Sequence, residues 1–323
     1  MRAFVTGAGG FIGAEVARQL RARGDGAVTL VRRPDHEQEL RDIGCELVEG
    51  DLVSMPQDAL VDAMRGSDAV FHLAGRYRIG IRATEHAAMY ASNVVATQRA
   101  LDAAIAAGAP RIVHVSTANV LGDTKGRVVD ETYERPQPPR FLSYYDETKY
   151  LAHRAADERI AAGAPILIAV LGAVYGPHDP SQLGETIAQA MAGTLPAVTF
   201  PDLGASMVHV ADVAAGILLI HEQGKIGESY ALAGEIVTGR ELVRRAAAIG
   251  GHRPPRLTVP GLLLRGISPL GGLIGPLMGQ APNFGELVRA ADGVTYWVSN
   301  AKARRELGWE PRDLETGLRS LLT

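Results

Sequence analysis

Residues 1–13 read MRAFVTGAGGFIG, and this stretch decides the fold. A short apolar strand ends at Thr6, three spaced glycines follow, and a helical pattern begins at once. Gly7 permits the tight turn after the strand, Gly10 lets the backbone approach a pyrophosphate, and Gly13 allows the helix to pack closely on the strand. The N-terminus of that helix adds unpaired N–H groups and a positive dipole. A lone glycine loop can be a plain turn, but its place between a first strand and a first helix predicts a dinucleotide site.

Two arginines stand where such a site usually reads the ribose of the cofactor. A second apolar strand ends at Val31, and Arg32 and Arg33 follow it directly. A site for NAD places Asp or Glu about 20 residues after the glycines, to accept from the 2′-hydroxyl. Guanidinium groups instead bind a 2′-phosphate through charge-assisted hydrogen bonds. The pair therefore favours NADP, with NAD as the alternative if both arginines are merely solvated loop residues.

The ends of the next two strands supply further expected contacts. Gly50-Asp51-Leu52 ends the third strand, where Asp51 can accept from the adenine amino group. Leu73-Ala74-Gly75 ends the fourth, and its small residues would let a cofactor lie across the strand ends.

A tyrosine and a lysine one helical turn apart, Tyr145 and Lys149, indicate proton-transfer chemistry. Positions i and i+4 share one face of a helix, so the phenol and the ammonium are expected to lie together. The cation should then lower the pKa of Tyr145 from its ordinary value of about 10. A hydroxyl at the preceding strand end, Ser116-Thr117, can hold a carbonyl oxygen while Tyr145 gives or takes a proton.

Alternating strand and helix patterns predict an α/β fold with a doubly wound parallel sheet of the Rossmann type. We expect 1–176 to form the dinucleotide-binding domain with the catalytic Thr, Tyr and Lys. Residues 177–323, where the pattern turns irregular, should form mainly a smaller substrate lobe, with some segments returning to the first domain. The expected strands are Arg2–Thr6, Val28–Val31, Glu46–Glu49, Ala69–Leu73, Arg111–Ser116 and Ile166–Val170, and the longest expected helices are Ala87–Ala107 and Tyr145–Ala162.

In this order the motifs resemble the extended short-chain dehydrogenase/reductase family. The likeness is to the branch of NAD-dependent epimerase/dehydratases, dihydroflavonol-4-reductase-like proteins and hopanoid-associated sugar epimerases. The matching stretches are Thr6 to Gly13, Asp51-Leu52, His72 to Gly75, Asn93-Val94 with Thr97, Ser116-Thr117 with Gly122, Tyr145 with Lys149, Val174 to Pro177, Val208 to Val210 with Asp212, and Asn300 to Trp309.

The resemblance implies a role for each matched residue. Tyr145 would be the general acid/base, and Lys149 would also bind the nicotinamide ribose. Thr117 is favoured as the catalytic hydroxyl by its register against Gly122, with Ser116 as the competitor. Asn93 matches a family asparagine, although it can equally make only structural bonds. The complete set expected to contact the cofactor is Gly7, Gly10, Phe11, Ile12, Gly13, Arg32, Arg33, Asp51, Leu52, Leu73, Ala74, Gly75, Asn93, Lys149 and Val174.

Departures from the family pattern separate the possible reactions. Dehydratases carry Asp-Glu after the catalytic Thr, whereas Ala118-Asn119 stands here, so a 4,6-dehydratase is not expected. The leading hypothesis is an NADP-dependent reductase or dehydrogenase acting on a ketone, an aldehyde or a secondary alcohol. The alternative is an NAD(P)-dependent epimerase of a nucleotide sugar or a related polyol. A catalytically silent NADP sensor is disfavoured because Thr117, Tyr145 and Lys149 are all present.

Composition excludes several classes of protein. The chain has 323 residues, a net charge of −3 and 46% hydrophobic residues, which is typical of a globular protein and indicates no nucleic-acid partner. Its one cysteine, Cys45, permits no intrachain disulfide, and no His, Asp or Glu cluster has metal-ligand spacing, so we expect no metal. With a strand beginning at the second residue there is no room for a signal peptide. A cytoplasmic homodimer acting on a small molecule is expected.

One apolar segment, Leu257 to Met278, has the length of a membrane span. Pro260, Pro269 and Pro276 interrupt it, and Arg265 lies near its middle. We therefore expect no transmembrane helix but one or two short helices that cover an apolar substrate pocket. A peripheral membrane contact and an oligomer surface are the alternatives.

Overall fold

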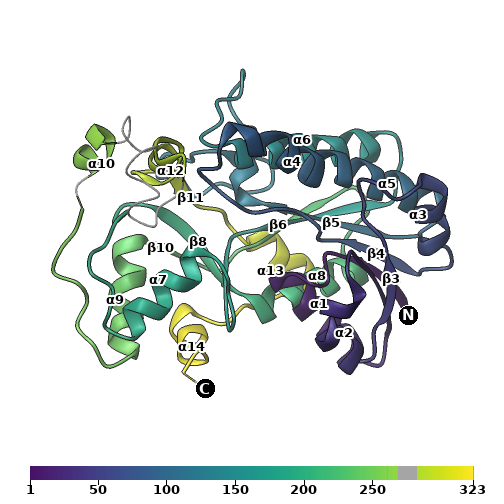
Figure 1. Ribbon diagram of the computed structural model, residues 1–323, viewed down its shortest axis with the longest axis horizontal. Helices are drawn as coiled ribbons and strands as arrows, with labels where there is room; N and C mark the ends of the chain where they lie inside the picture. Colours follow the sequence, from purple (N-terminus) through teal and green to yellow (C-terminus); the bar gives the residue numbers. More distant parts are fainter. Residues whose placement is uncertain (260, 268–281, 323) are drawn as a thin grey trace.

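A seven-stranded parallel sheet forms the main layer of the computed structural model, which describes residues 1–259, 261–267 and 282–322 (Figure 1). The strand order is β3-β2-β1-β4-β5-β6-β9, and each neighbouring pair is parallel. Strands covered on both faces are largely apolar, as β6 is throughout and β4 is apart from His72. The predicted doubly wound α/β fold is confirmed. The strands are β1 (Arg2–Thr6), β2 (Gly26–Val31), β3 (Glu46–Glu49), β4 (Ala69–His72), β5 (Ile112–Thr117), β6 (Ile166–Leu171) and β9 (Ser229–Leu232).

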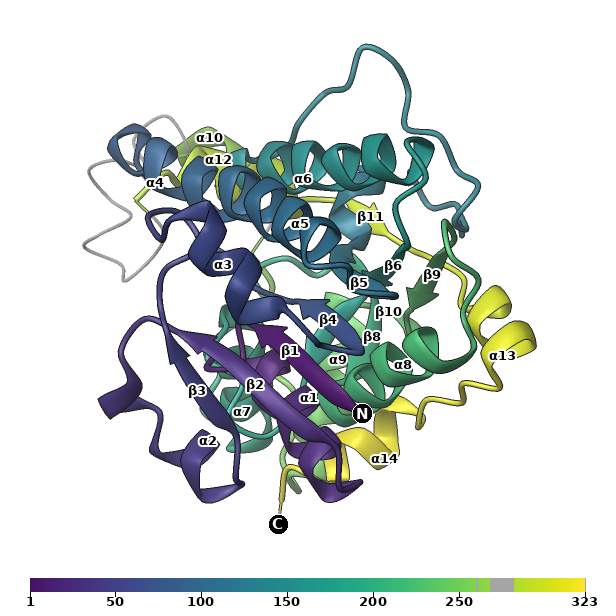
Figure 2. The same ribbon diagram turned by 90° about the vertical axis from the view of Figure 1, so that its right-hand side faces the viewer.

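Helices cover both faces of this sheet, as Figure 2 shows. On one face α1 (Phe11–Ala22), α8 (Val210–Gln223) and α13 (Ala301–Leu307) bury Val16, Ile217 and Leu307 against the strands. On the other, α3 (Gln57–Met64), α5 (Ala96–Ala106) and α6 (Tyr144–Ala161) bury Leu60, Leu101 and Ala156. The short elements α2 (Gln38–Asp42), Pro34–His36 and Ala83–Glu85 complete the connections.

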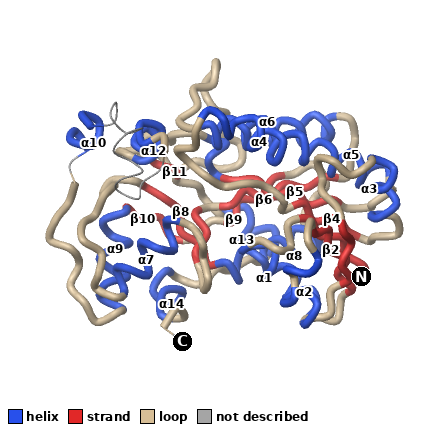
Figure 3. The backbone as a smooth tube through the Cα atoms, in the orientation of Figure 1, coloured by secondary structure: helices blue, strands red, loops and turns tan. Residues whose placement is uncertain are grey.

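A second, four-stranded sheet organises the rest of the chain (Figure 3). β8 (Gly204–His209) lies between β10 (Glu235–Thr238) and β11 (Thr295–Tyr296) and also pairs with β7 (Ala173–Tyr175). Around it lie α7 (Gln182–Met191), α9 (Gly239–Ile249), α10 (Gly261–Ile267), α12 (Phe284–Ala291) and α14 (Leu314–Arg319). The described residues after Pro177 thus form regular helices and strands, although their order does not continue the βα alternation of the first part of the chain. The sequence analysis missed β9, which is short and follows α8.

The helix expected over Ala87–Ala107 is interrupted. It consists of α4 (His86–Tyr90), a π-helical turn (Ala91–Val95) and α5. Such turns are frequent at functional sites because they re-aim a side chain. Here the turn carries the buried Asn93. Hydrophobic periodicity alone does not distinguish a π-helical turn from an α-helix.

A buried ion pair fastens the loop before α6 to the first turn of that helix. Nη1 and Nη2 of Arg135 lie 2.7 and 2.9 Å from the two carboxylate oxygens of Asp146. Their side chains are 6% and 0% exposed. The guanidinium also lies 4.7 Å from the ring centre of Phe141, and the backbone N–H of Leu142 donates to Asp146. Because Asp146 is the neighbour of Tyr145, this pair helps to fix the start of α6.

Replacing Arg135 by Ala should lower the free energy of unfolding by about 3 kcal/mol, because it leaves the Asp146 carboxylate buried without its cation. Urea unfolding followed by tryptophan fluorescence measures the change. Arg319→Ala, which removes an ion pair to Glu315 with both side chains 61% exposed, is the control and should have a much smaller effect. Equal effects of the two variants would contradict the role given to the buried pair.

Candidate active site

The glycine turn after β1 fits a bound pyrophosphate. Gly7 has φ +78°, and a Cβ there would lie 2.6 Å from the backbone nitrogen of Ala74. A Cβ on Gly13 would collide with the carbonyl oxygen of Gly7. Gly10 begins α1 without a side-chain cap, so the first N–H groups of the helix remain available to an anion. The turn therefore meets the end of β4 at Leu73 and Ala74, as a dinucleotide site requires.

The ribose end of this cradle holds one residue that the sequence analysis missed. Arg32 and Arg33 are exposed just after β2, as expected. The carboxylate of Glu37 lies on the glycine turn, because a Cβ on Gly9 would be 2.6 Å from its Oε1. Asp51 already accepts from the N–H of Val53 at 2.8 Å. Positive and negative side chains thus both border the site. Glu37 was not found from the sequence because the spacing rule looks for an acid directly after the strand.

Thr117 ends β5, and Tyr145 lies in the first turn of α6, which packs over this strand (Figure 2). The Thr117 hydroxyl lies near enough to the Tyr145 phenol to lower its pKa. Thr117 Oγ1 also lies 3.0 Å from the side-chain oxygen of Asn119 at the start of the short helix Ala118–Leu121. Ser116 turns the other way and pairs with His153 at 2.8 Å. Of the two hydroxyls considered, only Thr117 therefore lies beside Tyr145.

Lys149 is buried, like Tyr145, and lies against β5. Its Nζ donates to the carbonyl oxygen of Val115 at 3.1 Å and would be 4.0 Å from a Cβ on Gly75. The side chain is thus close to the end of β4, where the resemblance places the nicotinamide ribose. Burial lowers the pKa of Lys149 to about 8.

The expected lowering of the pKa of Tyr145 is wrong in this structure. Burial and the neighbouring Tyr77 raise its pKa, and only the hydrogen bond from Thr117 opposes them. The physical reason is desolvation, which disfavours a buried phenolate, while the Lys149 ammonium is held by a backbone carbonyl. At neutral pH the side chain of Tyr145 is therefore a phenol that carries its proton.

The side-chain amide of Asn93 forms hydrogen bonds with other groups of the protein. Its Nδ2 donates to Thr148 Oγ1 at 2.9 Å, and its Oδ1 accepts from the N–H of Arg76 at 2.6 Å. These bonds join the π-helical turn, α6 and the segment after Gly75. Val174, the last expected cofactor contact, is half-buried on β7. The bonds of Asn93 agree with the structural alternative considered for it.

An apolar wall rises beside Tyr145. The ring of Tyr77 meets that of Tyr145 edge-on, with centres 4.9 Å apart. Ile79 packs both against Tyr145 and against a cluster from the C-terminal lobe, namely Leu264, Phe284, Leu287 and Val288. Leu264 of this cluster belongs to α10, which lies in the described part of the segment Leu257 to Met278 that we expected to cover the substrate pocket. Residues 260 and 268–278 of that segment lie outside the described residues.

Glu286 on α12 is a second residue that the sequence did not reveal. Its side chain is 3% exposed, and its Oε1 accepts from the backbone N–H of Gly80 at 3.3 Å and of Tyr144 at 3.1 Å. A carboxylate is favourable at this place because the N-terminus of α6 carries a partial positive charge. Glu286 thus joins the lobe, the segment after β4 and the first turn of α6. Its position inside an amphipathic helix did not indicate in the sequence that Glu286 would be buried at this contact.

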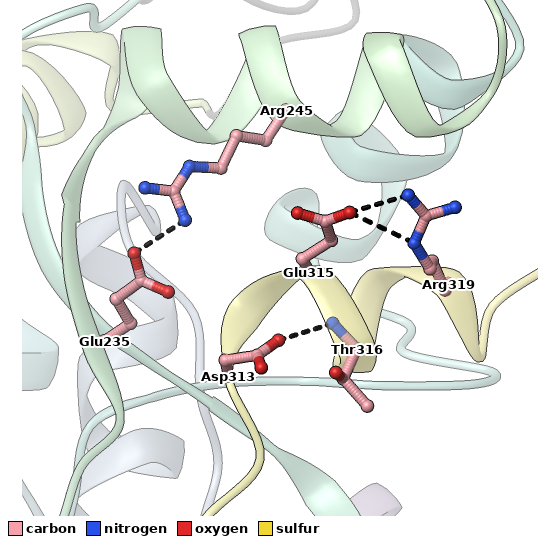
Figure 4. A pocket seen from close by; sticks show the side chains of 6 residues that line it. All are labelled: Glu235, Arg245, Asp313, Glu315, Thr316 and Arg319. Atoms are coloured by element: carbon pink, nitrogen blue, oxygen red, sulfur yellow. Dashed lines mark hydrogen bonds and ion pairs between the residues drawn. The ribbon is translucent and has the colours of Figure 1, made fainter.

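A cavity of about 320 Å³ lies elsewhere, between β10, α9 and α14 (Figure 4). Its charged groups already pair with one another, for example Glu235 with Arg245 at 2.6 Å and Glu315 with Arg319. The cavity is therefore not the candidate site. Across the described parts of the chain, no three His, Cys, Asp or Glu side chains gather as a metal would need. In those same parts, no helix has the length and hydropathy of a membrane span.

Comparisons with known proteins agree with this architecture. The model of the NAD dependent epimerase/dehydratase family matches residues 3–233. A Synechocystis protein named "Putative dihydroflavonol 4-reductase" is 32% identical over 264 residues, covering 80% of this chain and 75% of that protein. "Sterol demethylase protein B" of Methylococcus capsulatus is 29% identical and covers 96% and 94%. The crystal structure of gox2253 superposes with a TM-score of 0.83 at 30% identity, covering 99% and 96%. The chain belongs to the NAD-dependent epimerase/dehydratase family, within the extended short-chain dehydrogenases/reductases.

Proposed function

We propose that the protein is an NADP-dependent reductase of ketones or aldehydes. The observation that carries the proposal is the buried phenol of Tyr145, which holds its proton, next to the hydroxyl of Thr117. Reduction of a carbonyl requires a proton donor at the oxygen, and a phenol that keeps its proton at neutral pH is available as that donor. The bound cofactor supplies the hydride.

The chain's own residues divide the remaining work. Thr117 Oγ1 would hold the carbonyl oxygen, and Tyr145 would give that oxygen its proton as the hydride arrives. Lys149, fixed by the Val115 carbonyl beside Gly75, would bind the nicotinamide ribose and return a proton to the phenolate. Tyr77, whose ring meets that of Tyr145 edge-on, and Ile79, which packs against the cluster containing Tyr145, would border the reacting carbon.

The apolar wall supports a hydrophobic or aromatic substrate. Each Å² of apolar surface that leaves water contributes roughly 25 cal/mol. Leu264, Phe284 and Ile79 offer such surface next to Tyr145. The names of the two relatives refer to a dihydroflavonol and a sterol, and both compounds contain fused rings.

One observation favours an epimerase of nucleotide sugars as a second candidate. Arg76 and Arg78 lie 3.2 and 3.7 Å from the same carboxylate, Glu85, and Arg82 also acts on it electrostatically. Three guanidiniums facing one carboxylate leave positive charge next to Tyr77, and a diphosphate needs such charge. The region beside Tyr77 therefore carries more positive charge than the apolar C-terminal segment alone indicated.

Tyr145→Phe should reduce turnover by about 10²- to 10⁴-fold while leaving cofactor affinity nearly intact, because it removes only the transferable proton. Steady-state kinetics and a cofactor titration measure the two effects. Tyr144→Phe is the matched control, since the Tyr144 ring stacks on His86 with centres 3.8 Å apart and has no place in the proposed proton transfer. Near wild-type turnover in Tyr145→Phe would show that another group is the acid.

Arg32→Asp combined with Arg33→Ser should reverse the preference from NADP to NAD, because the 2′-phosphate then meets a carboxylate in place of guanidiniums. Binding titrations of both cofactors with wild type and variant measure it. Glu37→Gln is the companion variant and should tighten NADP binding by removing a negative charge at Gly9. Tighter binding of NAD than of NADP to wild type would overturn the cofactor assignment.

Kinetic competition distinguishes the two substrate classes. We expect apolar or aromatic ketones to be reduced by NADPH and nucleotide-diphosphate sugars to be poor ligands. Identification of the cofactor released from purified protein accompanies the assay, because an epimerase retains its cofactor through the cycle and a reductase exchanges it. Efficient turnover of a nucleotide sugar, with apolar ketones ignored, would favour the epimerase.

A further inference from the structure

A group of histidines lies under α6, behind the residues that face the substrate. His72 on β4 and His114 on β5 are each 1% exposed, and their rings stack with centres 5.5 Å apart. His72 is fully partnered, by Thr6 at 2.8 Å and Thr97 at 2.9 Å. Neither ring nitrogen of His114 has a hydrogen-bond partner. The mechanism proposed above uses none of these side chains.

The unpaired ring of His114 calls for an explanation. A buried polar group without a partner costs about 1–3 kcal/mol, and proteins usually satisfy such groups with ordered water. A buried water needs several polar partners. His114 directly precedes Val115, whose carbonyl receives the Lys149 ammonium, and the charge on Lys149 acts on the His114 ring. A water between them would satisfy both.

A second histidine connects this region to the surface. His153 lies one turn after Lys149 on α6, so both face β5. Its Nδ1 is 2.8 Å from Ser116 Oγ, and its Nε2 is 3.7 Å from a carboxylate oxygen of Asp157. Asp157 has a side chain 31% exposed and reaches solvent. A series of polar groups thus runs from Lys149 to the outside of α6.

We propose that Lys149 regains its proton from behind, along a path through His114, Ser116 and His153 that meets solvent at Asp157. His114 and His153 touch neither substrate nor cofactor in this scheme and act only through Lys149, as positioning and proton-holding residues. The path runs through the protein and does not pass Tyr77.

Each step conserves atoms and charge. The Tyr145 O–H bond breaks as its proton joins the substrate oxygen, and the phenolate then takes a proton from the Lys149 ammonium. The neutral amine takes a proton from the imidazolium of His153, through Ser116 Oγ and the water at His114. His153 is reprotonated from solvent beside Asp157. One proton from water replaces the one that leaves with each product.

The electrostatic interactions of His114 and His153 support a link between these rings and Lys149. Burial lowers the pKa of His153, Asp157 raises it, and Lys149 and Arg154 lower it further. Burial, Lys149, His72 and His153 together hold the pKa of His114 well below its usual range. Each of the two rings therefore senses the charge on Lys149. When Lys149 gives up its proton, the pKa of His153 rises and the ring takes up a proton from solvent more readily.

Stopped-flow kinetics of the whole protein tests the path, which rests on the proposed reductase function. The first turnover uses the proton already on Tyr145, whereas later turnovers need a new one. His153→Gln can still hydrogen-bond Ser116 but cannot carry a proton. We expect it to show a normal first turnover followed by a steady-state rate about tenfold lower. Glu158→Gln, an exposed neighbour on α6, is the control and should match wild type in both phases.

His153→Glu should restore turnover, because a carboxyl group also carries a proton. As the pH is raised, the rate of this variant should decline at a lower pH than the rate of wild type. The reason is that a carboxyl loses its proton above its pKa of about 4.3, whereas imidazole loses its proton above about 6.5. Equal first and later rates in His153→Gln would overturn the path, and so would failure of His153→Glu to exceed the glutamine variant.

Histidine-ring NMR without substrate provides a test independent of activity. Lys149→Met removes the ammonium and should raise the pKa of both His114 and His153. Unchanged titrations would overturn the link between Lys149 and these rings. If wild type fails to oxidise NADPH when ketones and aldehydes are supplied, the proposed reductase function fails, and the titrations still decide whether the groups are coupled.

Discussion

The buried polar face of α6 is the constraint on which the rest of the site depends. This face carries three buried polar residues, Asp146, Thr148 and Lys149. Burying such groups without hydrogen-bond partners costs free energy. A different segment satisfies each one. Arg135 pairs with Asp146, Asn93 bonds Thr148, and the end of β5 receives Lys149. The loop before α6, the π-helical turn and the central strand are therefore positioned relative to Tyr145 by hydrogen bonds as well as by apolar packing.

The same burial sets the protonation states of the site. Desolvation disfavours charge on any buried group, so it raises the pKa of Tyr145 and lowers that of Lys149. Both shifts favour the neutral forms, phenol and amine. A site built in this way is suited to donating a proton to a substrate oxygen, and it then depends on a fresh proton reaching Lys149. The buried histidines matter for this reason, because solvent does not surround that lysine.

Local patterns predicted what local physics determines. The glycine turn, β1, β3 and the start of α6 follow from spacing and apolar runs, and the structure has them at or within a residue of the predicted positions. Glu37 and Glu286 could not be found in this way, because their positions depend on contacts with Gly9 and Tyr144 far away in the sequence. The pKa of Tyr145 was predicted with the wrong sign for a related reason. Helical spacing shows which residues share a face, but not how deeply that face is buried.

Glu286 ties the C-terminal lobe to the segments that carry Tyr145 and Tyr77. Its carboxylate bonds the N–H groups of Tyr144 and Gly80, so α12 is tied to the helix that carries Tyr145 and to the segment that carries Tyr77. The next residues of α12, Leu287 and Val288, belong to the apolar wall. One helix thus supplies both the anchor and the surface that a substrate would meet. Its apolar side chains can change in size without disturbing the anchor, because the anchoring bonds go to backbone N–H groups. The chemistry at Tyr145 and the shape of the wall are in this way separable within a single turn of helix.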